Sequence, residues 1–527
     1  MNYDFDKLFS IKRKAVLSII FLIILIIVLI PAGCSSDTDA DTEEDFMEKY
    51  EASEINTDRT TIKFYFPGQQ PAGWNEVRTE IEEQLGSTVN VSLDFKWIDY
   101  QGYFQKMNIL DASEEPFDAF CVSKPDQYYP DFTKLAREDK LKDISQLFPV
   151  NAPTLMQKYT EEELSYASVD GKLYAIPSLY PEACCPYIFV DDALLKEYDI
   201  ENIANYDEYG AFLKTVRENE PELIPGTIKY ASDTLKLFAA TSGYVIADEL
   251  QGLVYKWGDP EMKLIAWENT PEFKESAYAL ADWFRKGYLA SNSDPLKTAS
   301  FVYYNSIRSQ LIGTIELPMR DSSGKTVTSK LLRQFYLYPE NPVQRENPMG
   351  SFGGNGSFAF PATSLNTERA IQFVDWVQQS SSNYFLTMYG REGKDYVLEY
   401  DYPQLPEGID SNNSYMYWDG SWAFNNMEYL PVYTDKKGNK LEGQKEFLDK
   451  NSKYPPHGAF YPDYRSIETI AKIRSNAYFE FNNLINNGLV IDTFQIDSFI
   501  KKLDMLKSAS LVEVAQKQLD EAVEGRK

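Results

Sequence analysis

The sequence predicts an α/β fold, and three observations support this prediction. From Thr61 onward, short apolar runs typical of strands alternate with segments whose apolar residues recur at helical spacing. Strand–helix alternation of this kind favours a mainly parallel sheet with covering helices. The composition, 43% hydrophobic and 25% charged, is that of a globular protein, and 527 residues correspond to two large domains or three ordinary ones.

The first elements follow one another closely. Residues 62–66 form an apolar run that ends at Pro67 and Gly68, as a strand before a turn does. Apolar residues then recur at helical spacing from Trp74 to Leu85, with Gly86 at the C-cap position. The elements expected next are a half-buried strand at 89–97, a helix at 103–110 and an apolar strand at 117–122.

The second half of the chain continues the same alternation. A helix beginning at Thr270 and Pro271 ends at Gly287, and Pro suits a first helical position. Ser510 and Glu513 form a capping-box pattern for the last helix. The other elements expected here are strands at 187–190 and 311–315 and helices at 192–198, 206–218 and from Asn366.

The charge and residue counts exclude several function classes. A net charge of −28 opposes nucleic-acid binding, which requires a basic surface. One histidine, His457, and four cysteines cannot supply a usual zinc ligand set, and we expect no metal and no cofactor. His457 lies in a Pro-rich loop, and the chain has no nucleophile-elbow, P-loop or dinucleotide-binding motif.

The amino terminus predicts export. Basic residues precede a mostly apolar run at 15–30, and Pro31-Ala32-Gly33 places small residues before Cys34. The segment resembles the signal peptide of bacterial lipoproteins, which implies cleavage after residue 33 and lipidation of Cys34. An uncleaved membrane anchor is the alternative. The acidic residues at 34–60 predict a solvated tether, although Asp37-x-Asp-x-Asp faintly resembles a calcium loop with Thr42 in place of its glycine.

The other cysteines predict no disulfide framework. Cys121 lies in an apolar run and is expected to be a buried strand residue. The adjacent Cys184 and Cys185 are compatible either with a strained vicinal disulfide or with burial as small apolar side chains.

Several motifs together resemble one protein family. Residues 170–177, Asp-Gly-Lys-Leu-Tyr-Ala-Ile-Pro, are similar to the hinge strand of extracellular solute-binding proteins of carbohydrate ABC transporters, the group that includes maltodextrin-binding protein. Residues 353–361 resemble the return crossing of that group. The segments 389–396, 422–426 and 516–520 resemble an oligosaccharide-binding lipoprotein subgroup of low-GC Gram-positive bacteria, with Asn425 in place of a glycine.

This resemblance implies a two-lobed, periplasmic-binding-protein-like fold of class II with hinge crossings. The expected lobes are 61–180 plus 306–362 and 181–305 plus 363–527. It implies a monomeric, non-catalytic receptor on the outer face of the cytoplasmic membrane, anchored through Cys34. The receptor would bind an oligosaccharide between its lobes and deliver it to the permease subunits of an ABC importer.

A sugar presents hydroxyl groups around apolar faces, so its site needs planar aromatic rings together with carboxylates or amides. Loops after strands and at lobe interfaces are the usual places for such groups. Core packing, exposed turns or, for Glu182, a hinge salt bridge are the alternative roles. The candidate ligand-binding residues are Gln69, Gln70, Trp74, Tyr128, Tyr129, Tyr180, Glu182, Trp257, Tyr303, Glu316, Trp418 and Trp422.

Two other functions remain open from the sequence. A surface glycoside hydrolase needs only two suitably spaced carboxylates, and the chain is rich in acidic residues. A receptor for a peptide or another non-sugar solute would share the same fold. The aromatic content of 14% favours the sugar receptor over the peptide receptor.

Overall fold

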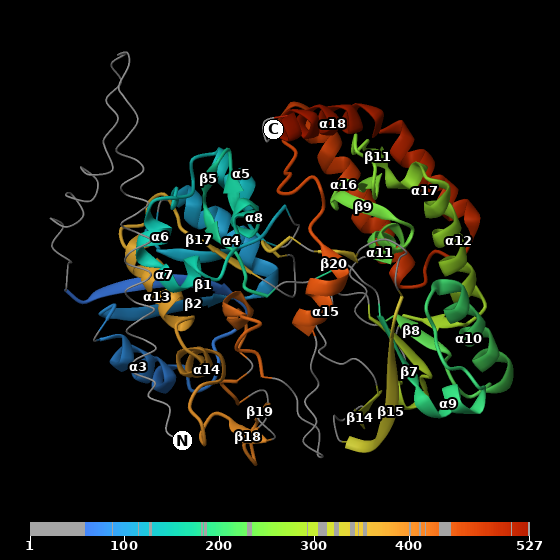
Figure 1. The fold of residues 1–527 in the computed structure, drawn as a ribbon, viewed down its shortest axis with the longest axis horizontal. Coiled ribbons are helices and arrows are strands. Elements are labelled where there is room, and N and C mark those ends of the chain that lie inside the picture. Colours follow the sequence, from blue (N-terminus) through green and yellow to red (C-terminus); the bar gives the residue numbers. More distant parts are fainter. Residues whose placement is uncertain are drawn as a thin grey trace, which may run out of the picture. The chain divides into compact units, whose positions relative to one another are not determined.

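In a computed structural model the chain divides into two units, Met1–Asp58 and Arg59–Lys527, and the helices and strands described below belong to the second unit (Figure 1). The structure describes residues 58–86, 88–113, 115–125, 129–180, 183, 187–228, 234–291, 294–303, 314–320, 326–337, 343–345, 347–350, 356–399, 402–409, 413–416, 418–431, 444–506 and 508–524.

The first sheet has the strand order β2-β1-β3-β17-β6. β1 pairs in parallel with both β2 and β3, whereas β17 is antiparallel to β3 and β6. Aromatic rings fill its core, because Phe64 contacts Phe95, Phe358 and Phe373 at centroid distances of 5.4–5.7 Å. The strands are β1 (Thr60–Pro67), β2 (Val91–Ile98), β3 (Ala119–Val122), β6 (Ala175–Ile176) and β17 (Ser357–Ala359).

Helices and short strands surround this sheet, and all of them except β18 and β19 contribute side chains to its core. They are α3 (Trp74–Leu85), α4 (Tyr100–Ser113), α5 (Phe132–Arg137), α6 (Leu147–Asn151), α7 (Pro153–Met156), α8 (Glu161–Ser165), β4 (Ser168–Val169), β5 (Lys172–Leu173), α13 (Thr367–Val377), α14 (Ser381–Tyr389), β18 (Val397–Glu399), β19 (Tyr402–Gln404) and the 3₁₀ helix η3 (Ser421–Phe424). We call residues 59–176 and 356–431 the first lobe.

The second sheet has the order β12-β8-β13-β7-β15-β14. β12, β8 and β13 are parallel to one another, and β7, β15 and β14 pair antiparallel. The strands are β7 (Tyr187–Asp191), β8 (Gly226–Ile228), β12 (Leu289–Ala290), β13 (Ser300–Tyr303), β14 (Thr314–Arg320) and β15 (Thr326–Tyr336).

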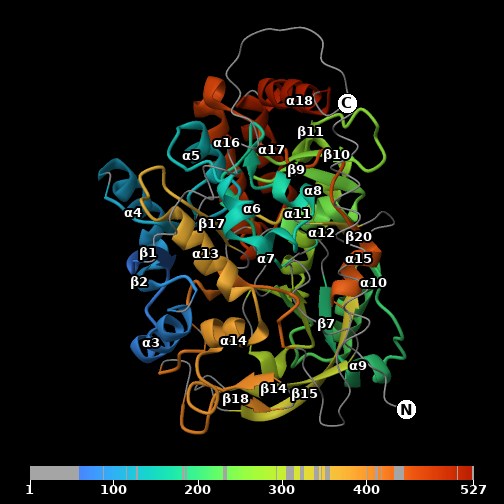
Figure 2. The ribbon, with the colours of Figure 1, turned by 60° about the vertical axis from the view of Figure 1, so that its left-hand side comes forward.

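A three-stranded sheet of order β11-β10-β9 and a set of helices complete the second lobe, defined as residues 187–337 and 468–524. In Figures 1 and 2, β7, α9 and α10 gather apart from β1, β2 and α3 of the first lobe. The elements are α9 (Asp192–Glu197), α10 (Tyr206–Asn219), α11 (Thr234–Thr241), β9 (Tyr244–Asp248), β10 (Leu253–Lys256), β11 (Ile265–Ala266), η1 (Trp267–Asn269), α12 (Pro271–Arg285), η2 (Pro295–Lys297), α16 (Glu468–Asn486), α17 (Thr493–Met505) and α18 (Ser508–Glu524).

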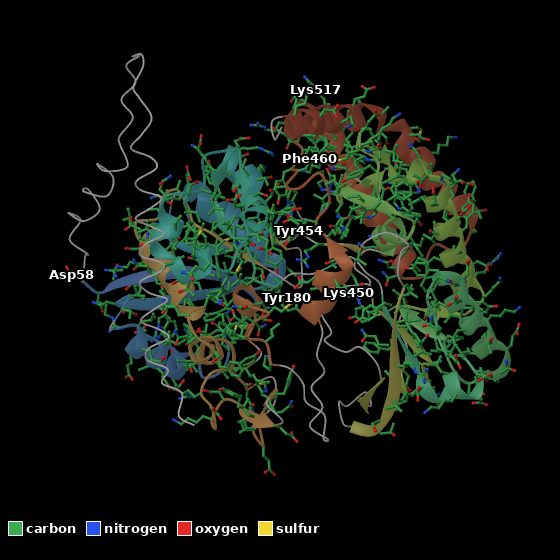
Figure 3. All side chains as sticks on the ribbon, viewed as in Figure 1. Asp58, Tyr180, Lys450, Tyr454, Phe460 and Lys517 are labelled. Carbon is green, nitrogen blue, oxygen red and sulfur yellow. The ribbon has the colours of Figure 1, made fainter. Side chains whose placement is uncertain are left out.

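Three crossing segments, 177–186, 338–355 and 432–467, connect the lobes. The second carries β16 (Val343–Gln344), and the third carries α15 (Gln444–Asn451), β20 (Ser452–Lys453) and η4 (Arg465–Ile467). β16 pairs in parallel with β20, so two crossings are joined by backbone hydrogen bonds. Figure 3 labels Tyr180 of the first crossing and Lys450, Tyr454 and Phe460 of the third.

The predicted α/β class is confirmed, but both sheets are mixed rather than mainly parallel. The lobe boundaries also differ from those expected. β14 and β15, which fall within the stretch expected in the first lobe, pair with β7 of the second sheet. α13 and α14, expected in the second lobe, pack into the core of the first, because Phe373 and Tyr384 belong there. Among the described residues, no helix is both long and apolar enough to cross a membrane.

Candidate functional site

The carboxyl ends of β1, β2 and β3 lie at one edge of the first sheet, because these strands are parallel. Gln69 and Gln70 follow β1 and are exposed, while Tyr100 follows β2 and is half-buried. Ser123 and Lys124 follow β3. This edge therefore gathers polar and aromatic side chains from three loops that are far apart in the sequence.

A turn from the distant segment 418–424, which we call the aromatic turn, closes over this edge. Asp419 accepts the backbone N–H of Gln69 on Oδ2 at 3.1 Å and the Tyr100 hydroxyl on Oδ1 at 3.2 Å. Its carbonyl oxygen accepts the indole N–H of Trp97 at 3.0 Å. Asp419 therefore ties the aromatic turn to the loops after β1 and β2.

Trp422 is the half-buried aromatic residue of this turn. Its ring meets that of Tyr129 edge-on, with centroids 5.6 Å apart and planes at 78°. Trp422 also lies next to Tyr100, and burial raises the pKa of Tyr100 to about 12, so the Tyr100 hydroxyl stays protonated and donates to Asp419. Trp422 is thus oriented by Tyr129 on one side and by the Tyr100–Asp419 pair on another.

Two of the expected tryptophans lie in the core instead. Trp74, the first residue of α3, is 4% exposed and stacks on Phe95 at 4.6 Å. Trp418 is also 4% exposed, and its indole N–H donates to the carbonyl oxygen of Thr387 at 3.1 Å. Both rings therefore support the sheet edge from within, and we do not include them in the proposed site.

The first crossing segment runs beside the aromatic turn. Leu179 forms a β-bridge with Asn426, and the N–H of Met427 donates to the Leu179 carbonyl at 3.1 Å. Tyr180 follows directly; its side chain is buried and its N–H donates to Ser178 Oγ. The first crossing segment and the residues just after the aromatic turn, about 250 residues apart in sequence, thus lie in direct contact.

The second-lobe candidates are more dispersed. Trp257 follows β10 and packs partly buried against the core formed with α18. Tyr303 is the last residue of β13, where it pairs with Tyr187. Glu316 lies within edge strand β14 opposite Leu331, rather than after a strand as expected. Tyr128, Glu182, Cys34, Cys184 and Cys185 lie outside the described residues.

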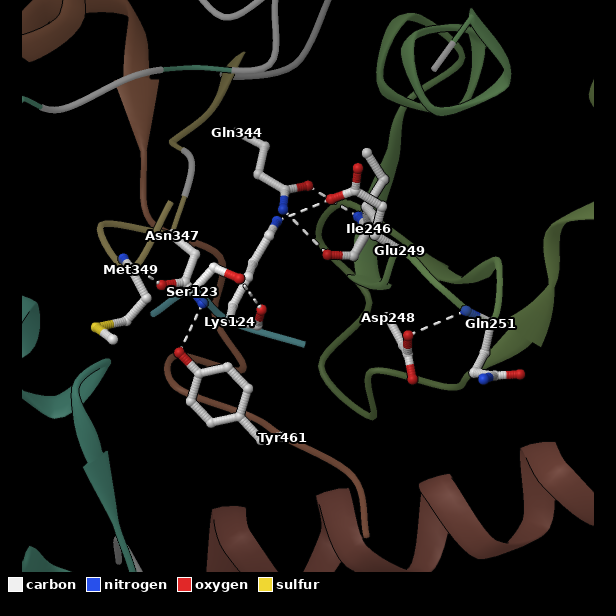
Figure 4. A network of polar contacts seen from close by, with 10 residues as sticks. All are labelled: Ser123, Lys124, Ile246, Asp248, Glu249, Gln251, Gln344, Asn347, Met349 and Tyr461. Atoms are coloured by element: carbon white, nitrogen blue, oxygen red, sulfur yellow. Dashed lines mark hydrogen bonds and ion pairs between the residues drawn. The ribbon is translucent and has the colours of Figure 1, made fainter. Parts of the chain in front are cut away.

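A pocket of about 400 Å³ lies between the lobes beside the crossings. Figure 4 shows polar contacts of several residues that line it, among them Lys124, Glu249 and Gln344. Lys124 and Arg137 line it from the first lobe, Asp248 and Glu249 from the second, and Arg345 and Tyr461 from the crossings.

Contacts across this pocket join the three regions. Lys124 Nζ forms an ion pair with Glu249 Oε2 at 2.8 Å, directly between the lobes. The side-chain amide of Gln344 hydrogen-bonds both the N–H and the carbonyl oxygen of Ile246, at 2.8 and 3.0 Å, as a neighbouring strand would. Asn347 donates to the Tyr461 hydroxyl at 2.7 Å, so the second and third crossings are also linked.

Two titratable groups that line this pocket, Asp248 and His457, have hydrogen-bond partners. Burial raises the pKa of Asp248, which accepts the Tyr464 hydroxyl at 2.7 Å. His457 is buried and shares a 2.9 Å hydrogen bond between Nδ1 and the Tyr255 hydroxyl. Cys121 does not line this pocket: it lies buried in β3, as predicted, and burial raises the pKa of its thiol. Within the described part of the chain, no three His, Cys, Asp or Glu side chains gather as metal ligands would.

The sequence did not single out four of the residues that build the site: Tyr100, Asp419, Lys124 and Glu249. Asp419 contacts residues 319 to 350 positions away, so no local spacing signals the contacts. The Asp419-Gly420 pair is a turn signal, and it indicates the shape of the aromatic turn but not the sheet edge on which it rests.

Comparisons with known proteins concern the sequence and fold of the chain as a whole. No family model matches the chain. A carbohydrate ABC transporter substrate-binding protein of Streptococcus pneumoniae is 22% identical over 484 residues, which cover 89% of this chain and 92% of that protein.

Solved structures show the same fold. The N-glycan transport solute-binding protein NgtS of S. pneumoniae is 17% identical and matches with a TM-score of 0.70 over 89% of this chain and all of that one. Its complex with Man5GlcNAc matches at 18% identity with a TM-score of 0.63, covering 89% and 99% of the two chains. An HMO-binding, ABC-transporter-associated solute-binding protein of Bifidobacterium longum infantis is 15% identical, with a TM-score of 0.58 over 88% and 99%.

The expected resemblance and fold class are both confirmed. The chain has the two-lobed fold of solute-binding proteins, and along nearly its whole length it is a homologue of a carbohydrate ABC transporter substrate-binding protein.

Proposed function

We propose that the chain is an extracellular receptor that binds an oligosaccharide between its lobes and delivers it to an ABC importer. The observation that carries this proposal is the half-buried Trp422, held beside Tyr100 and Asp419 at the carboxyl edge of the first sheet. An aromatic face next to polar groups is what a sugar ring with apolar faces and peripheral hydroxyls requires.

The remaining polar groups of the edge extend this site. Gln69 and Gln70 are exposed beside Asp419 and offer amide donors and acceptors to sugar hydroxyls. Tyr129 borders Trp422. Six further residues remain predicted ligand contacts from the loop after β3, the first crossing and the second lobe: Tyr128, Tyr180, Glu182, Trp257, Tyr303 and Glu316.

The names of the similar proteins support a sugar over a peptide. The S. pneumoniae relative is named for carbohydrate, and NgtS structures hold Man1GlcNAc and Man5GlcNAc. None of these relatives is named as an enzyme, and we propose that this chain also binds its ligand without cleaving it.

We further propose that a thioether-linked lipid on Cys34 holds a monomeric receptor at the outer face of the cytoplasmic membrane. Metabolic labelling with a radioactive fatty acid should label the chain, and the Cys34→Ser variant should be unlabelled and released into the medium. Equal labelling of both proteins would contradict the anchor.

A thermal-melt screen of the purified full chain in mild detergent tests the function. The panel contains Man1GlcNAc, Man5GlcNAc, kestose, milk and alginate oligosaccharides, and a mixture of short peptides as the non-sugar arm. A ligand at 100 times its Kd adds about 2.7 kcal/mol to the free energy of unfolding, which is a visible shift. Stabilisation by one glycan class that is recovered intact supports the receptor. Stabilisation by peptides alone, or recovery of a cleaved glycan, contradicts it.

A further inference from the structure

The aromatic turn rests on the first sheet at two glycines. A Cβ on Gly356, just before β17, would lie 1.8 Å from Cζ3 and 2.6 Å from Cε3 of Trp422. A Cβ on Gly68, just after β1, would lie 1.9 Å from the Cβ of Asp419. Real Cβ atoms do not approach other atoms this closely, so the turn can occupy its position only because both residues lack a side chain.

The two glycines have different backbone requirements. Gly68 has a φ of 113°, so the backbone conformation there already favours glycine. Gly356 has no left-handed φ, so its φ does not call for a glycine. The absence of a side chain at position 356 is therefore explained by the indole ring lying over it rather than by the local backbone.

The contacts of Trp422 fix the ring once it is seated. The Tyr129 ring meets it edge-on with the ring centroids 5.6 Å apart, and the neighbouring Tyr100 hydroxyl donates to Asp419. Displacing the ring from Gly356 would therefore disturb its contact with Tyr129 and its position beside Tyr100 together. The half-buried indole keeps part of its surface accessible in this arrangement.

We infer that Gly356 is a positioning residue for ligand binding: the space above its Cα seats the Trp422 indole so that the ring presents a fixed face to a pyranose ring. Gly68 likewise leaves space for the side chain of Asp419 at the other end of the turn. This inference rests on the proposed function for its ligand, whereas the seating of the ring does not depend on any ligand.

A double-mutant cycle tests the inference. Gly356→Ala should weaken binding of the glycan found in the melt screen by roughly tenfold, because the added methyl group displaces the indole. Trp422→Ala should weaken it about as much, because it removes the indole. The two substitutions should not be additive, since the residues are in contact. The double variant should bind no more weakly than Trp422→Ala, since without the indole the added methyl meets nothing. Losses that multiply in the double variant would overturn the inference.

Gly102→Ala is the matched control. Gly102 lies in α4 of the same lobe, and the nearest atom to an added Cβ is Ile98 Cγ2 at 3.9 Å. This variant should retain full affinity, which separates a seating effect from a general effect of adding a methyl group. An equal loss of affinity in Gly102→Ala would remove the support for a specific seat.

A measurement without ligand tests the position of the Trp422 indole over Gly356 separately from glycan binding. The chain contains 8 tryptophans, and with 5-fluorotryptophan each gives a fluorine resonance. The signal lost in Trp422→Phe identifies Trp422, and that signal should shift in Gly356→Ala but not in Gly102→Ala. If no glycan binds, the proposed function fails while this spectrum still tests the seat; an unshifted Trp422 signal overturns the inference itself.

Discussion

Two ion pairs differ in how completely the protein surrounds them: Arg474–Glu268 inside the second lobe and Lys124–Glu249 between the lobes. Both side chains of the first pair are 0% exposed, whereas those of the second are 15% and 27% exposed. The first pair belongs to a lobe core, and the second bridges two cores.

Both members of the buried pair make several hydrogen bonds. The guanidinium of Arg474 contacts both carboxylate oxygens of Glu268 at 2.7 and 2.9 Å and donates to the Gln251 carbonyl oxygen and Ser508 Oγ. Tyr478 donates to the same carboxylate at 2.7 Å. These bonds join α16 to η1, to the β9–β10 turn and to the start of α18.

Among the described residues, the bridging pair is the ion pair that directly joins the two lobes, and its 2.8 Å contact is partly exposed to solvent. A fully buried pair is costly to break, whereas a partly exposed pair contributes little to stability, so the charges inside the lobe hold its elements together more strongly than Lys124–Glu249 holds the two lobes together. This is the distribution that hinge closure around a ligand requires.

The largest expected effect is on the buried pair. Glu268→Ala should lower the free energy of unfolding by about 3–5 kcal/mol, because it leaves the Arg474 charge buried without its partner. Urea denaturation measures the change. In the exposed pair Lys214–Glu218, Glu218→Ala should change stability by less than about 1 kcal/mol. Equal effects of the two substitutions would contradict the comparison.

The two tryptophans of the aromatic turn should separate stability from binding. Trp418→Ala should destabilise the chain by about 3–5 kcal/mol, because its ring is buried against Phe66 and its N–H is bonded to Thr387. Trp422→Ala should cost less stability but more glycan affinity. Denaturation and titration calorimetry of the two variants measure both quantities, and a reversed order would place the ligand face on Trp418.

The pH dependence of the second lobe should reflect Asp192. A hydrogen bond from Lys196, followed by one from Arg333, lowers the pKa of this carboxyl. A lowered folded-state pKa contributes stability above the unfolded value of about 3.9, and that contribution is lost as the pH falls through the folded-state pKa. Asp192→Asn should therefore destabilise the chain at neutral pH but not in acid. A stability difference that persists unchanged into acid would show that the charge is not responsible.

The smallest expected effect on stability is at the bridging pair. Lys124→Met keeps the side-chain stem and should change the free energy of unfolding by less than about 1 kcal/mol, because the pair is partly exposed. The same variant should bind glycan more weakly than the parent at low salt, since closure loses a favourable contact. The difference should shrink as salt screens the pair. A difference that is unaffected by salt would assign Lys124 a direct ligand contact instead.

The sequence predicted what depends on local patterning. The helix expected from Trp74 to Leu85 has these bounds in the structure, since its apolar spacing and Gly86 define both its core-facing side and its end. The last helix begins at Ser508, two residues before the predicted cap. The lobe assignment failed at β14 and β15, because strand pairing with β7 depends on contacts that no local pattern encodes.

The site followed the same rule. Trp422 was predicted from the density of aromatic residues, but the same density did not distinguish it from buried Trp418. The position of Trp422, unlike that of Trp418, depends on how the aromatic turn packs on Gly356 and Gly68. These two glycines lie at the ends of strands that are far apart in the sequence. Asp419 was missed for the same reason, because its partners lie more than 300 residues earlier in the chain.

Titration calorimetry of the parent chain and of Trp422→Ala, with the glycan that stabilises the chain most, tests the central claim most directly. We predict that the parent binds the glycan and returns it intact, and that Trp422→Ala binds it at least severalfold more weakly with its fold unchanged. Equal affinity of the two proteins, or recovery of a cleaved glycan, would contradict the account of an oligosaccharide receptor that binds at this sheet edge.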